Sequence, residues 1–133
     1  MKVGNSKEIT ISELLGAIQD ISTQQLTLYI PNKDKNGKQI RKLNVWIIEA
    51  QNVLTSIGRG VTTMPPADGA WENPENKNII REKTFLMYTY IDPDLFVKNI
   101  KLLREYLHRF GRETDQGEVA FELEGRFFSY LKI

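Results

Sequence analysis

The sequence predicts an α+β domain in which a ferredoxin-like β-α-β-β-α-β order forms an antiparallel sheet with two helices on one face. Two segments, 42–57 and 93–110, carry apolar residues at helical spacing along one side only, as helices that cover a sheet must. Runs rich in β-forming residues precede, separate and follow them, and most are bounded by proline or glycine. The length of 133 residues and the hydrophobic content of 41% suit one globular domain.

The domain is expected to span residues 25–133, after an N-terminal extension over 1–24. Within the extension, Thr10 and Glu13 have the spacing of a helix capping box and stand before an apolar run. We therefore expect a short added helix over roughly residues 11–20.

The first half of the domain is predicted to form a strand, a helix and a second strand. Residues 25–30 mix apolar and polar β formers and stop at Pro31. After a polar turn, the one-sided apolar pattern over 42–57 predicts the first long helix, and Gly58 is placed to end it. A short strand is expected over 61–64, before two consecutive prolines.

The middle of the chain is predicted to contain a long loop and then the clearest strand. Residues 67–78 are rich in glycine, asparagine and proline, and they include Trp71. We expect them to form a connection longer than the usual hairpin loop, a feature that is often functional. Residues 79–91 then carry the strongest strand pattern in the sequence.

The last third is predicted to hold the second long helix and a hairpin. Asp92 and Pro93 suit the N-cap and the first position of this helix, and its apolar residues recur at helical spacing as far as residue 110. Residues 118–123 alternate apolar and polar side chains, which predicts a half-buried strand. Residues 126–131 are expected to return as an added C-terminal hairpin strand.

The composition excludes several chemistries. The chain has no cysteine and one histidine, so disulfides, thiolate nucleophiles and metal sites that need cysteine or two histidines are excluded. We expect neither a metal nor a cofactor. The N-terminus lacks the apolar core of a secretory signal, and no apolar run reaches the roughly 18 residues of a membrane helix. A cytoplasmic protein without membrane contact is therefore predicted.

Four short motifs carry a resemblance to a group of proteins. They are the run 69–71 (Gly-Ala-Trp), the run 80–82 (Ile-Arg-Glu), the helix end 107–111 (Leu-His-Arg-Phe-Gly) and the run 116–119 (Gln-Gly-Glu-Val). Together they resemble small uncharacterised bacterial domains of predicted ferredoxin-like fold, over roughly residues 26–123. The residues between Gly111 and Gln116 depart from that pattern. The resemblance implies the fold and implies no activity.

Six residues near strand starts are candidates for a ligand site. They are Trp71, Arg81, Glu82, Arg112, Glu113 and Gln116. In the functional interpretation, Arg81 holds an anionic ligand near Trp71, and Glu82 or Glu113 orients it. In the simpler interpretation, the arginines and glutamates form surface ion pairs.

Two groups of basic residues are candidates for contact with phosphate groups. The first group comprises Lys33, Lys35, Lys38, Arg41 and Lys42, before and at the start of the first long helix. The second group comprises Lys98, Lys101, Arg104 and His108, on the predicted outer face of the second long helix. Clusters of this kind suit a nucleic-acid backbone, whereas a solvated charged surface is the simpler explanation.

Two apolar residues of the first long helix fall outside its buried stripe. Val45 and Ile48 point away from the predicted core and need cover from another surface. The N-terminal helix or a second copy of the chain could provide it. Since ferredoxin-like sheets also expose an edge that can pair, we expect a homodimer.

These observations favour a non-catalytic binding or regulatory module that recognises a small anionic ligand or a protein partner. One alternative is a nucleic-acid-binding module that uses the two basic groups. The other alternative is a small dimeric α+β barrel enzyme with a closed cavity lined by Tyr88, Tyr90 or Phe85. Fold similarity alone does not choose among the three.

Overall fold

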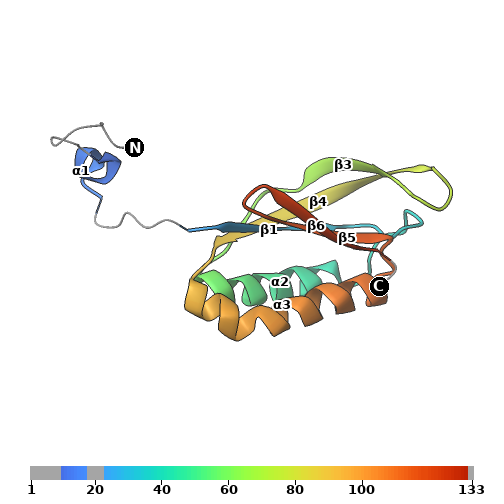
Figure 1. The fold of residues 1–133 in the computed structure, drawn as a ribbon. Helices are drawn as coiled ribbons and strands as arrows, with labels where there is room; N and C mark the ends of the chain where they lie inside the picture. The colour runs from blue at the N-terminus through green and yellow to red at the C-terminus, as the bar shows by residue number, and fades with distance from the viewer. Residues whose placement is uncertain (1–9, 18–22, 132–133) are drawn as a thin grey trace.

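A computed structural model of the chain describes residues 10–17 and 23–131. Its centre is an antiparallel sheet, and two long helices, α2 (Leu43–Gly58) and α3 (Pro93–Glu113), pack side by side against one face of it (Figure 1). The structure confirms the predicted α+β class and the ferredoxin-like order of elements.

The sheet has six strands. They are β1 (Gln25–Pro31), β2 (Thr62–Thr63), β3 (Ala67–Glu72), β4 (Ile79–Tyr90), β5 (Glu118–Leu123) and β6 (Arg126–Leu131). The spatial order is β2-β4-β1-β5-β6, and β3 also pairs with β4. The central strand β1 thus lies between β4 and β5, while β6 is the hairpin strand added beside β5.

Side-chain alternation along β1 separates the core from the opposite face of the sheet. Leu26, Leu28 and Ile30 are fully buried, whereas Tyr29 and Pro31 point the other way and are only partly buried. The residues that form the described core are Leu26, Leu28, Ile30, Ala50, Val53, Leu54, Ile57, Met87, Ile91, Leu103, Tyr106, Leu107, Phe110 and Val119. Helix residues at the spacing predicted from the sequence therefore cover the apolar face of the sheet.

The predicted loop over residues 67–78 is largely a strand, and that prediction was wrong. Residues 67–72 form β3, which pairs with β4, and the connection shrinks to the turn 73–78. The amide of Asn73 donates to the carbonyl of Asn78 at 2.8 Å and closes this turn. Because β3 has no β-branched residue, its strand conformation depends on pairing with the long strand β4.

β2 and β3 form one interrupted edge strand along β4. From Thr63 to Ala67 the edge advances four residues, while the paired positions on β4, Met87 and Thr84, are three apart. The extra residue makes a bulge at Pro65–Pro66, where missing amide protons prevent regular pairing.

Helix α2 ends in close contact with β4. A Cβ atom added at Gly58 would lie 1.9 Å from Oγ1 of Thr89 and 2.4 Å from the carbonyl oxygen of Tyr90. The Thr89 hydroxyl itself donates to the carbonyl of Gly60 at 2.6 Å. Gly58 is therefore needed for the approach of the helix to the sheet, in addition to its predicted place at the helix end.

Helix α3 begins at Pro93, as predicted, and its N-cap is Asp92. The Asp92 carboxylate accepts hydrogen bonds from the amides of Asp94 and Leu95, and these bonds hold the pKa of its carboxyl below the usual range. The helix continues to Glu113, three residues beyond the predicted end.

The N-terminal helix α1 (Ile11–Leu15) begins where the capping box predicted it. The Thr10 hydroxyl accepts a hydrogen bond from the amide of Glu13, and Gly16 ends the helix in the left-handed conformation. The predicted continuation to residue 20 lies partly outside the described residues.

The apolar residues of α1 do not cover those of α2. In α1, Leu14 and Leu15 are 64% and 77% exposed, while Val45 and Ile48 of α2 remain 54% and 55% exposed. The homodimer predicted to cover this surface of α2 stays a prediction. None of the helices in the described part of the chain is long and apolar enough to cross a membrane.

Candidate functional site

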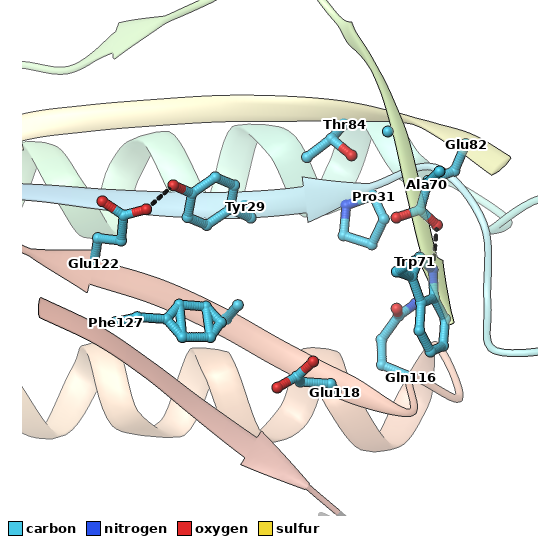
Figure 2. Close-up of a pocket in the computed structure, with 12 residues that line it drawn as sticks. Tyr29, Pro31, Ala70, Trp71, Glu82, Thr84, Gln116, Glu118, Glu122 and Phe127 are labelled. Atoms are coloured by element: carbon cyan, nitrogen blue, oxygen red, sulfur yellow. Dashed lines mark hydrogen bonds between the residues drawn. The ribbon is translucent and has the colours of Figure 1, made fainter. Parts of the chain in front are cut away.

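A hollow with aromatic and acidic walls lies on the sheet face that points away from α2 and α3 (Figure 2). Its volume is about 370 Å³, within the range of small-molecule sites. Its lining residues are Tyr29, Pro31, Gly69, Ala70, Trp71, Glu82, Thr84, Gln116, Glu118, Ala120, Glu122 and Phe127. We call this hollow the sheet pocket.

Strand alternation and register place these side chains on one face. Tyr29 lies between two buried core residues of β1 and therefore points to the opposite side. In β5, Glu118 and Glu122 occupy the positions that alternate with the core residue Val119. On β6, Phe127 pairs directly with Glu122, and it is 58% exposed at the pocket.

One end of the sheet pocket is built by β3 and β4. The indole Nε1–H of Trp71 donates a hydrogen bond to Oε1 of Glu82 at 3.2 Å (Figure 2). Burial raises the pKa of the Glu82 carboxyl to about 6, although the Trp71 hydrogen bond and the charge of Lys33 act in the opposite direction. Glu82 is therefore a half-buried carboxyl that changes its charge just below neutral pH.

The opposite end of the sheet pocket is built by β1 and β5. The hydroxyl of Tyr29 donates a hydrogen bond to the Glu122 carboxylate (Figure 2). Burial and this negatively charged neighbour raise the pKa of Tyr29 to about 12, so the phenol stays protonated and remains a donor at neutral pH.

Gln116 reaches the Trp71 end of the pocket from the segment before β5 (Figure 2). Its side chain is 9% exposed, and its Nε2 group donates to the carbonyls of Lys33 and Thr114 and to the Thr114 hydroxyl, at 3.1–3.3 Å. The next residue, Gly117, lies against the Trp71 ring, so a Cβ there would be 3.2 Å from Cη2.

Gly117→Ala is expected to displace the Trp71 indole by a few tenths of an ångström and weaken its hydrogen bond to Glu82. The cause is the tight contact that a new Cβ would make with the ring, with a stability cost of about 1 kcal/mol. Indole N–H signals in NMR spectra measure the effect, and the distant Trp46 provides an internal control. The Trp71 signal should move while that of Trp46 stays, and an unchanged Trp71 signal would contradict the predicted contact.

The charge of the sheet pocket is acidic. Its walls include three glutamates, Glu82, Glu118 and Glu122, and none of the described lining residues is a lysine or an arginine. Three aromatic rings, those of Tyr29, Trp71 and Phe127, complete the walls. Carboxylates and aromatic faces attract cations, so this pocket suits a positively charged ligand better than the anionic ligand predicted from the sequence.

The structure brings together three of the six predicted ligand residues. Trp71, Glu82 and Gln116 line the sheet pocket. Arg81 does not, because it neighbours Glu82 on β4 and therefore points to the other face of the sheet. Arg81 lines a second hollow with Lys33 and Lys83, which shares Gly69 and Glu82 with the sheet pocket, and the Lys33 ammonium donates to the Arg81 carbonyl at 3.0 Å.

Arg112 and Glu113 also lie away from the sheet pocket. Both are exposed in the last turn of α3, and Glu113 lines a different surface hollow with Trp46. The helix extends past its predicted end, so these residues belong to helix surface rather than to a loop over Trp71. The predicted anion site built on Arg81 with Glu113 is not assembled.

The first basic group is partly engaged within the chain. Besides the bond of Lys33 to Arg81, the ammonium of Lys35 lies 3.5 Å from the carboxylate of Asp115. The other members, Lys38, Arg41 and Lys42, are exposed.

In the second basic group, three residues are exposed and the fourth packs against another part of the chain. Lys98, Lys101 and Arg104 are exposed, as predicted. His108 is not on the outer face. The centroid of its ring lies 4.3 Å from the centroid of the Tyr130 ring, and its Nε2 atom is enclosed without a hydrogen-bond partner among the described residues. The C-terminal hairpin covers this side of α3, which the helix pattern alone did not reveal.

Several residues of the sheet pocket were not among the candidates predicted from the sequence. They are Tyr29, Glu118, Glu122 and Phe127. The alternation of 118–123 already marked a polar face, so the two glutamates could have been recognised as a pair. Among the described residues, no group of three or more histidine, aspartate or glutamate side chains is arranged to hold a metal ion.

The fold and the pocket define an α+β protein with an acidic, aromatic hollow on one face of its sheet. No family model and no curated protein matches the chain. One similar solved structure is a phage SAM lyase in complex with S-methyl-5′-thioadenosine, with a TM-score of 0.62 and 9% identity over 86% of this chain and 95% of that chain. The phage SAM lyase in its apo state has a TM-score of 0.56 and 8% identity over 86% of this chain and 94% of that chain.

This comparison corrects the predicted function. At 8–9% identity the likeness shows the fold, and the two solved structures that share it over 86% of this chain are both of an enzyme. The prediction of a non-catalytic binding module was therefore wrong. An enzyme was among the alternatives, but the cavity predicted for it differs, since Phe85 packs against the core and Tyr88 and Tyr90 line another hollow.

Proposed function

We propose that this protein is an enzyme that binds S-adenosylmethionine in the sheet pocket and cleaves it to S-methyl-5′-thioadenosine. The observation that carries the proposal is the composition of the pocket walls, with three carboxylates, three aromatic rings and no basic residue among the described lining residues. The similarity to the phage SAM lyase over 86% of this chain supports it.

The chemistry of the substrate fits these walls. S-adenosylmethionine carries a sulfonium and an ammonium, and both cations are attracted by carboxylates and by the faces of aromatic rings. Its purine is a flat ring that can stack on an indole or phenyl group. Trp71 and Phe127 lie at the two ends of the pocket, so either end presents an aromatic surface beside a glutamate (Figure 2).

In the proposed reaction the substrate's own carboxylate oxygen attacks the carbon bound to the sulfur and closes a five-membered lactone, while the bond between this carbon and the sulfur breaks. The sulfur keeps the electron pair, loses its positive charge and becomes the thioether of S-methyl-5′-thioadenosine. The pocket carboxylates hold the cationic substrate more strongly than this uncharged product, which favours exchange of product for substrate. Their role in the proposal is to bind and orient.

Incubation of the purified protein with S-adenosylmethionine tests the proposal. We expect S-methyl-5′-thioadenosine to form in step with the loss of substrate, at a rate proportional to protein concentration, as measured by liquid chromatography and mass spectrometry. A protein-free sample gives the background rate. Product formation no faster than this background, with protein in excess over substrate, would overturn the proposed activity.

A further inference from the structure

The amide of Gln116 has one orientation. Its Nε2 group donates to the carbonyl of Lys33 at 3.1 Å, to the carbonyl of Thr114 at 3.3 Å and to the Thr114 hydroxyl at 3.1 Å. A side-chain amide turned by 180° would place its oxygen against two carbonyl oxygens, which repel it. The nitrogen therefore points to the loop before α2 and to the end of α3.

The amide oxygen of Gln116 is the free end of this group. It accepts no hydrogen bond from any described residue, and it is not among the fully enclosed atoms that lack a partner, so it is not completely enclosed. The side chain lines the sheet pocket beside Trp71 (Figure 2). The pocket thus contains an uncharged acceptor of fixed position, next to an indole ring that Gly117 and Glu82 hold in place.

We propose that Oε1 of Gln116 accepts a hydrogen bond from the 6-amino group of the purine, with the purine stacked on Trp71. This makes Gln116 a residue that selects 6-aminopurine nucleosides, and the assignment rests on the proposed function. An oriented acceptor rejects a base that lacks the donor, because the acceptor then loses its water without gaining a partner.

The charges of the pocket support different hydrogen-bond partners for the purine amine and for the ammonium of the substrate. The substrate has two kinds of N–H donor, the purine amine and the ammonium of its amino acid group. The ammonium is a cation and is attracted by the carboxylates of Glu118 and Glu122. The neutral purine amine does not need a charged partner, and the neutral amide oxygen of Gln116 beside an aromatic ring can accept its hydrogen bond.

Binding of two uncharged nucleosides to the wild-type protein tests the inference. The probes are S-methyl-5′-thioadenosine and its analogue with hydrogen in place of the 6-amino group, each measured by titration calorimetry. Neither contains the amino acid group, so the ammonium does not contribute. We expect the amino compound to bind at least tenfold more tightly, a discrimination typical of a lost hydrogen bond to a desolvated acceptor.

Equal affinities of the two nucleosides would overturn the role of Gln116 and leave the proposed function standing. Binding of neither nucleoside would also overturn this inference, whereas the proposed function is decided separately by the cleavage of S-adenosylmethionine. Gln116→Met adds a second measurement, since it should bring the ratio of the two affinities close to one when circular dichroism shows a folded protein. A folded variant that keeps the wild-type ratio would assign the discrimination to another residue and contradict the proposal.

Discussion

Glu82→Gln is expected to weaken the binding of S-adenosylmethionine by about thirtyfold or more, while the protein stays folded. The substitution removes a half-buried negative charge from the pocket wall, and loss of one charged partner in such a site costs about 2 kcal/mol or more. The glutamine oxygen can still accept the Trp71 hydrogen bond, so the geometry of the pocket is preserved.

The same substitution should raise stability above pH 6. The pKa of Glu82 is raised from 4.5 to about 6 in the folded protein, so the folded state holds the proton more tightly than the unfolded chain. Stability therefore falls as pH rises through that interval, and glutamine avoids the loss. The gain expected at pH 7.5 is about 1 kcal/mol, after a reduction for the solvent exposure of this side chain.

The pH dependence of binding follows from the same group. The cationic substrate binds the ionised form of Glu82, so its affinity should decrease as pH falls through about 6, and by about tenfold between pH 7.5 and pH 5. The uncharged S-methyl-5′-thioadenosine should show little change. Calorimetry at several pH values, with a non-cleavable cationic analogue, measures this difference.

Glu105→Gln is the matched control for the effect of Glu82→Gln on binding. Glu105→Gln removes one exposed carboxylate from the surface of α3 and should change neither affinity nor its pH dependence. Wild-type affinity in a folded Glu82→Gln protein, or equal losses in both variants, would contradict a direct role of Glu82.

Gly58→Ala is expected to destabilise the protein by about 3 kcal/mol or to prevent folding. The new methyl group would lie 1.9 Å from the Thr89 hydroxyl and 2.4 Å from a backbone carbonyl oxygen of β4. The hydroxyl could rotate away, but the carbonyl belongs to the paired strand, so α2 would have to move off the sheet. Denaturant unfolding followed by circular dichroism measures the loss.

Gly60→Ala is the control for this prediction. A Cβ at this position meets nothing within 4 Å, although the residue is only two positions away. We expect its free energy of unfolding to stay within about 0.5 kcal/mol of the wild-type value. Equal stability of the two variants would show that the close approach of α2 to β4 is not required.

Much of the fold followed from local patterns. The apolar stripes of α2 and α3 have a helical period, and the alternation over β1 and β5 has the period of a strand, so a one-dimensional pattern was enough to place them. The N-cap of α3 was equally local, because Asp92 acts on amides two and three residues away. The βαββαβ order follows from these elements.

β3 could not be predicted in this way. Its sequence contains glycine, alanine and aspartate, residues that favour turns or are neutral, and it becomes a strand because β4 is long enough to pair with it. The paired residues are 7–17 positions apart in sequence, so the residue pattern within 67–72 alone does not indicate the pairing. That pairing then places Trp71 beside Glu82.

The helices, most of the strands and the separation of an apolar from a polar sheet face depend on residues close together in the chain, so local patterns predict them. Which polar residues share a site depends instead on how the strands pair. This pairing joined Tyr29 to Glu122 and Trp71 to Glu82, and it turned Arg81 to the opposite face. A shift of the strand register by one residue turns every side chain of the strand to the other face of the sheet. The register is fixed by pairing between segments that are distant in the sequence.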